Sequence, residues 1–172
     1  MIRNAILLTV IVLSLLSQGC GWRLRGQIDL PPGMEKTFLS GVDFYSELGV
    51  EIQARLQGAG AGLVQDKSAA TAILHIVTNK IEKRVLSIDS SGRAGEYELS
   101  YLLVFRLMDQ HGAVLVNDQT VTTLRELRFD PNNVLSTGDE EERLRKDMLQ
   151  FSVRQMLNRL NISLQKSRNT NQ

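Results

Sequence analysis

The chain has 172 residues, a formal net charge of +1 at pH 7 and 42% hydrophobic residues. This near-neutral balance argues against a nucleic-acid binder, and any anion binding must come from local patches of charge. The length is that of one domain with a substantial core.

Residues 1–19 are predicted to be a lipoprotein signal peptide. Arg3 precedes an apolar run from Ala5 to Leu16, which is too short to span a bilayer but typical of a secretory signal. The single cysteine of the chain, Cys20, follows four residues later. A lone thiol is unusual in an oxidising compartment unless it is chemically capped, and acylation would cap it. Cys20 is therefore the predicted lipidation site and membrane anchor.

Three further segments are expected after the signal peptide. Residues 20–35 are the predicted lipidated N-terminus and linker, because Pro31 and Pro32 forbid regular strand pairing there. Residues 36–164 are the predicted single α/β domain. Residues 165–172 are predicted to be a disordered tail, because Ser167 to Gln172 are wholly polar.

The domain is expected to open with a short strand over 36–42 and a helix over 45–57. Ser46 is the predicted N-cap, and Gly58 should end the helix. The apolar residues of the helix recur with a spacing of four, at Leu48, Ile52 and Leu56.

Three long strands are predicted in the middle of the chain. The first, over 72–88, has an apolar set with a spacing of four, namely Ile73, Val77, Ile81 and Val85. The second alternates apolar and other residues from Tyr97 to Leu107, and the third runs from about 114 to 129. Turn sequences at 89–92 and 109–112 separate them, which indicates an antiparallel meander.

A helix of roughly 23 residues is predicted to end the domain. Thr137 and Glu140 have the spacing of a capping box, and acidic residues follow where the helix dipole favours anions.

The sequence contains no constellation that indicates catalysis. His75 lies within a predicted strand and His111 in a predicted turn, without the spacing of metal ligands. No nucleophile-elbow pattern is present. We therefore expect no enzymatic activity, no metal and no cofactor.

Basic residues gather on the predicted strands, and five of them are candidates for binding an anion. Charges on an exposed sheet face commonly serve solubility alone. Arg93 differs because it lies at a hairpin turn, where we expect few local partners and free access for a phosphate or carboxylate. The five candidates are Lys83, Arg84, Arg93, Arg125 and Arg128.

Two segments and the order of elements resemble the LPS-assembly lipoprotein LptE family. The segment Cys20-Gly-Trp-Arg-Leu-Arg-Gly26 is similar to the motif that follows cleavage in that family, and Gly95-Glu-Tyr-Glu-Leu99 is similar to its Ala-Glu-Tyr segment. The resemblance covers about residues 20–160. It implies an α/β (α+β) two-layer sandwich, with two helices on one face of a mostly antiparallel four-stranded sheet.

The resemblance also implies a function without catalysis. Members of the family are lipid-anchored at the cell outer membrane, plug and help assemble the β-barrel protein LptD, and contact lipopolysaccharide on its way to the outer leaflet. A basic residue at the hairpin tip contributes to that contact, which Arg93 approximately matches. A second basic residue is expected before the last helix, but residues 131–138 contain none, and Arg125 or Arg128 are the possible substitutes. The alternative is a freestanding envelope lipoprotein that binds a small ligand or peptidoglycan.

Overall fold

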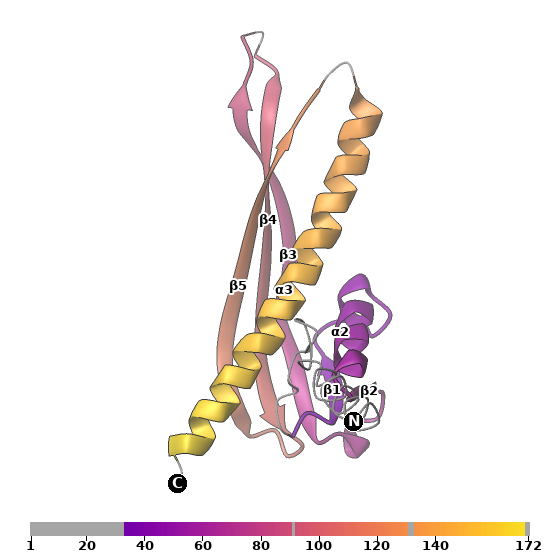
Figure 1. Cartoon of the computed structure of the whole chain (residues 1–172), viewed down its shortest axis with the longest axis vertical. Coiled ribbons are helices and arrows are strands. Elements are labelled where there is room, and N and C mark those ends of the chain that lie inside the picture. The colour runs from indigo at the N-terminus through magenta and orange to yellow at the C-terminus, as the bar shows by residue number, and fades with distance from the viewer. Residues whose placement is uncertain (1–32, 91, 131–132, 171–172) are drawn as a thin grey trace, which may run out of the picture.

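The computed structural model describes residues 33–90, 92–130 and 133–170. The predicted signal peptide, Cys20 and most of the predicted linker lie outside these residues. The described part is an elongated two-layer structure, in which a long twisted sheet is covered on one face by two helices (Figure 1). We call this covered side the helix face and the opposite side the outer face.

The sheet is mixed and has five strands in the order β2-β1-β3-β4-β5. Strand β1 (Lys36–Ser40) pairs in parallel with both β2 (Gly62–Val64) and β3 (Ala72–Ile88). Strands β3, β4 (Ala94–Asp109) and β5 (Val114–Arg128) form the predicted antiparallel meander. The two-layer α+β class is confirmed, but the prediction of four strands is wrong. Strand β2 was missed because its three residues are too few to show a period.

Helix α2 (Glu47–Gly58) follows the sequence prediction closely. The Ser46 hydroxyl caps the helix by accepting a hydrogen bond from the Gly49 N–H at 3.1 Å. The stripe of Leu48, Ile52 and Leu56 is buried against the sheet. After β2, a short 3₁₀ helix (Lys67–Ala69) leads the chain into β3.

The apolar face predicted for β3 is wrong over half of its residues. A β-bulge between Ile76 and Thr78 shifts the register against β4 and changes which side chains face the helices. Leu74 and Ile76 lie in the core before the bulge and Ile81 packs against it after the bulge, whereas Val77 and Val85 are 42% and 53% exposed. In β4 the predicted alternation is confirmed, since its odd-numbered residues from Leu99 to Leu107 are buried.

Helix α3 (Val134–Thr170) is longer at both ends than the sequence predicts. Thr137 is not the cap but lies in the first turn, where its hydroxyl donates to the Asn133 carbonyl at 3.2 Å. Residues 165–170, predicted to be disordered, are helical. No proline or glycine follows Gly138 to stop the helix, and bonds such as Gln165 Nε2 to Asn161 Oδ1 at 3.0 Å support its last turns.

The core lies between α2, α3 and the helix face of the sheet. Met34, which lies within the predicted linker, is fully buried in this core, so the packed domain begins before residue 36. Helix α3 contributes Met148, Met156 and Leu160. The described residues contain no helix that is both long and apolar enough to cross a membrane.

Candidate functional site

The hairpin turn between β3 and β4 and the start of α3 lie at one end of the molecule, which we call the distal end (Figure 1). The Phe129 N–H donates to the Gly95 carbonyl at 2.9 Å and so extends the β4–β5 ladder beyond Arg128. The Phe129 ring meets that of Tyr97 edge-on, with centroids 6.1 Å apart. These contacts hold together the ends of the strands that carry the candidate cations.

Neighbouring residues of a strand point to opposite faces of the sheet, and this divides the five candidate cations. Arg84 is level with Glu98, and its Nε lies 2.7 Å from Glu98 Oε1 on the outer face. Arg128 is level with Glu96 on the same face, at a longer distance of 3.6 Å between Nε and Oε1. The Arg128 side chain is 90% exposed, so solvent and ligands can reach its guanidinium group.

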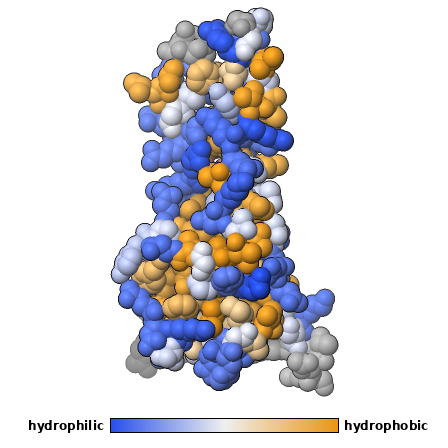
Figure 2. Space-filling view, turned by 180° about the vertical axis from the view of Figure 1, so that it is seen from behind, coloured by the Kyte–Doolittle hydropathy of each residue, from blue (hydrophilic) through white to orange (hydrophobic). Residues whose placement is uncertain are grey.

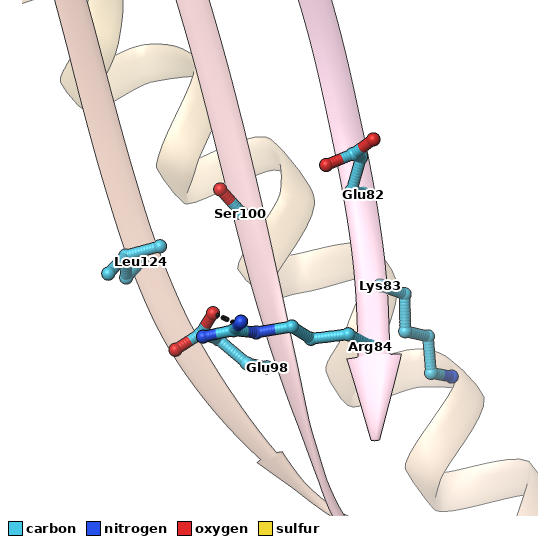
Figure 3. Close-up of a pocket in the computed structure, with 6 residues that line it drawn as sticks. All are labelled: Glu82, Lys83, Arg84, Glu98, Ser100 and Leu124. Carbon is cyan, nitrogen blue, oxygen red and sulfur yellow. Dashed lines mark hydrogen bonds and ion pairs between the residues drawn. The ribbon is translucent and has the colours of Figure 1, made fainter. Parts of the chain in front are cut away.

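Two hollows on the distal half of the molecule adjoin these arginines. The larger has a volume of about 610 Å³, and Figure 3 shows Arg84 reaching across β4 to Glu98 in it. Its lining residues are Glu82, Lys83, Arg84, Glu98, Ser100 and Leu124. The smaller, about 310 Å³, adjoins the turn and includes Ile88, Arg128 and Phe129 in its lining. Both combine charged groups with apolar side chains.

Arg93 does not have the isolated position that the sequence predicts. Its Nε lies 3.3 Å from Asp89 Oδ2, and its backbone N–H donates to Asp89 Oδ1 at 2.9 Å. Gly92, with φ of +79°, makes the turn that brings the two residues together. The expectation that Arg93 would meet an anion without breaking an internal ion pair is therefore wrong. Its side chain is nevertheless 62% exposed.

Lys83 and Arg125 lie on the helix face, in one row of the sheet on either side of buried Leu99. The Lys83 ammonium is 2.5 Å from Glu141 Oε2 in α3 and 4.2 Å from the centre of the Tyr97 ring. The Arg125 guanidinium lies 5.9 Å from the centre of the Phe151 ring in α3. The structure therefore does not join the five cations into one surface: these two hold the helix to the sheet.

Glu141 is the centre of the polar contact between α3 and β3. Partial burial of its carboxyl group raises the pKa, but the hydrogen bonds and positive charges of Lys83 and Arg145 outweigh that effect. The pKa of Glu141 is consequently below its ordinary value of 4.5. Arg145 binds the same carboxylate, with Nη2 at 2.7 Å from Oε1.

Large apolar side chains are exposed on the same half of the molecule. Ile88 is 69% and Leu135 is 85% exposed, and Val85, Leu86, Leu124 and Val134 are also exposed. On the outer face, Figure 2 shows hydrophobic side chains near the distal end, separated by a hydrophilic band from others lower on the sheet. Sequence reasoning missed this surface, because a pattern of apolar residues does not show which of them a helix will cover.

The described residues contain no group of three or more potential metal ligands. The distal surface can instead offer guanidinium groups, carboxylates and apolar side chains to a partner. That combination fits an amphiphilic molecule or an apolar protein surface with a charged rim.

The chain matches a known protein family over most of its length. Residues 28–160 match the family model LptE, described as lipopolysaccharide-assembly. The chain belongs to the LptE family. The resemblance read from Cys20–Gly26 and Gly95–Leu99 is thereby confirmed at the level of the family.

Individual relatives are similar in sequence to this LptE-family chain over most of its length. It is 25% identical over 165 residues to the LPS-assembly lipoprotein LptE of Photorhabdus laumondii, covering 92% of this chain and 86% of that protein. It is 26% identical over 165 residues to the protein of the same name from Yersinia enterocolitica, covering 92% and 76% of the two chains. The chain is thus a member of a family of LPS-assembly lipoproteins.

Solved structures share its fold. The solution structure of an uncharacterized lipoprotein B from Nitrosomonas europaea is 33% identical, with a TM-score of 0.69 over 83% of this chain and 91% of that one. The rare lipoprotein B from Shewanella oneidensis is 24% identical, with a TM-score of 0.61 over 78% and 97% of the two chains, and supports the fold alone.

Proposed function

We propose that this LptE-family chain is an outer-membrane lipoprotein that plugs and helps assemble the LptD β-barrel. It would also contact lipopolysaccharide during transport to the outer leaflet. The observation that carries the proposal is the family match over residues 28–160. Acyl chains on Cys20 would anchor it, facing the periplasm and the barrel lumen. The work is done by surfaces, without an enzymatic step, a cofactor or nucleic acid.

The distal end supports the lipopolysaccharide contact. Lipid A carries phosphate groups next to acyl chains, so a matching surface needs exposed cations beside exposed apolar groups. Arg84, Arg93 and Arg128 supply guanidinium groups there, and Ile88 and Leu124 lie in the hollows beside Arg128 and Arg84. Lys83 and Arg125 are less suited to this role, because α3 already engages both.

Arg128 offers the sharpest test of the ligand contact. The change Arg128→Glu should weaken binding of purified lipopolysaccharide by about tenfold or more, since a charge-assisted contact contributes about 1.5–3 kcal/mol and the variant replaces it with repulsion. Lys67→Glu is the matched control, because it changes the net charge equally on the exposed 3₁₀ helix that precedes β3. Equal affinities of the two variants would remove Arg128 from the proposed contact.

Depletion in the cell tests the assembly role. Loss of the protein should lower the amount of folded LptD barrel in the outer membrane and the lipopolysaccharide at the cell surface. Unchanged barrel and lipopolysaccharide levels after depletion would favour the alternative, a freestanding envelope lipoprotein that binds a small ligand or peptidoglycan.

A further inference from the structure

Strand β5 is an edge of the sheet, and it is long. Its residues Val114–Arg128 pair with β4 on one side, and no strand follows it in the sheet order of the described residues. An edge strand exposes a row of backbone N–H and C=O groups that can pair with a strand of another molecule. An edge of 15 residues offers many such groups for pairing.

Two arginine side chains donate hydrogen bonds to backbone carbonyl groups of this strand. Arg159 of α3 donates from Nη1 to the Thr120 carbonyl at 2.5 Å, across 39 residues of sequence. Arg125 donates from Nη1 to the carbonyl of Leu124 at 2.8 Å. The Phe151 ring beneath the Arg125 guanidinium group helps to hold it in this position.

Both carbonyls belong to the same edge. The register between β4 and β5 runs without a shift from Gln119 to Arg128, so backbone groups of every second residue point the same way. Thr120 and Leu124 are four residues apart and therefore share their direction with Thr122 between them. Because the inner edge is engaged with β4, side chains can reach these carbonyls only from the outer edge.

We infer that Arg125 and Arg159 act as edge caps, which close the central part of β5 against strand addition by a second copy of the chain. Each cap occupies an acceptor that an incoming strand would need. Each also places a positive charge on the edge, so that two copies brought edge to edge repel one another. This inference goes beyond the proposed function and does not depend on a barrel partner.

Removal of both caps tests the inference on the mature chain without its lipid. Arg125→Ala/Arg159→Ala should form dimers whose mass, by analytical ultracentrifugation, is twice that of the wild type at the same concentration. The matched control, Arg143→Ala/Lys146→Ala, removes two positive charges from exposed positions of α3 and should sediment as the wild type does. Circular dichroism establishes that all three proteins are folded. A folded double variant that stays monomeric across the concentration range overturns the inference.

Hydrogen exchange at the Thr122 amide tests whether the outer edge of β5 is the surface that associates. It should exchange rapidly with solvent deuterium in the wild type and slowly in the dimer, because a second β5 strand would accept its hydrogen bond. Adding Thr122→Pro to the double variant removes this outward donor and should restore the monomer. Association that leaves the Thr122 amide unprotected, or that survives the proline, would show that another surface is responsible and would overturn the inference.

Discussion

Gly41 should be among the least replaceable residues of the domain. It follows β1 with φ of +83°, and a Cβ atom there would lie 2.0 Å from the carbonyl oxygen of Ile76. The left-handed backbone alone costs an alanine about 1–2 kcal/mol. The contact adds to this cost, because Ile76 is a backbone neighbour held by its pairing with β4 and cannot rotate away. We expect Gly41→Ala to lower the free energy of unfolding by more than about 3 kcal/mol.

Substitutions at Gly60 and Gly58 allow the cost of the left-handed backbone to be measured separately from the cost of the contact with Ile76. Gly60 has a similar φ of +84°, but a Cβ atom there would meet nothing within 4 Å, so Gly60→Ala should cost only about 1–2 kcal/mol. Gly58 ends α2 in open space with an ordinary φ, and Gly58→Ala should be neutral or stabilising by about 0.4–1 kcal/mol. Urea unfolding followed by circular dichroism gives all three values. A loss for Gly41→Ala no larger than that for Gly60→Ala would refute the reasoning.

Three further predictions concern titration and anchoring. Burial, and to a lesser extent the charge of Glu47, raises the pKa of Tyr101 to about 12. The free energy of unfolding should therefore fall as pH rises from 10.0 towards that value. Tyr101→Phe should remove the part of this fall that comes from Tyr101, as measured by urea unfolding at alkaline pH. The lowered pKa of Glu141 contributes stability above its ordinary value of 4.5 that is lost as pH falls through the folded value. Lys83→Met should therefore destabilise the protein at neutral pH and by less in acid, and an equal effect at both would exclude the ion pair as the cause. Cys20→Ala should leave a folded protein that is soluble in the periplasm, and intact mass of the wild type should show the added lipid.

Elements with a strong local signal could be predicted from the sequence. Helix α2 has a capping serine and an apolar stripe with a regular spacing, and both features act within a few residues. Strand β4 is buried on one face only, so its alternation is visible from Tyr97 to Leu107. In both elements, the local preference of the chain agrees with its tertiary surroundings.

Features that depend on pairing between distant segments could not be predicted. The bulge at Val77 arises from the match between β3 and β4 and reverses the facing of the residues beyond it. Strand β2 exists because β1 offers it a parallel partner, and its three residues show no pattern of their own. Helix α3 begins at Val134, before the apparent cap at Thr137, and it continues to Thr170, since no glycine or proline follows Gly138.

The candidate site could likewise be predicted only in part from the sequence. Its basic residues are evident in the sequence, but the face that each occupies follows from the register of the sheet. Lys83 and Arg84 are neighbours in the chain, yet one binds α3 and the other binds Glu98 on the outer face. The Asp89 partner of Arg93 lies only four residues away and could have been anticipated from the turn itself. The proposed function rests on the family match, because no catalytic pattern in the sequence specifies one.

Co-purification tests the central claim most directly. The full-length lipidated protein, extracted from the outer membrane in a mild detergent and isolated through an affinity tag, should carry the LptD barrel in a one-to-one complex that survives gel filtration. Arg128→Glu should retain the barrel, since the charge of that residue is assigned to the ligand rather than to the partner. Recovery of the folded lipoprotein alone, under conditions in which the barrel is present in the same extract, would contradict the account.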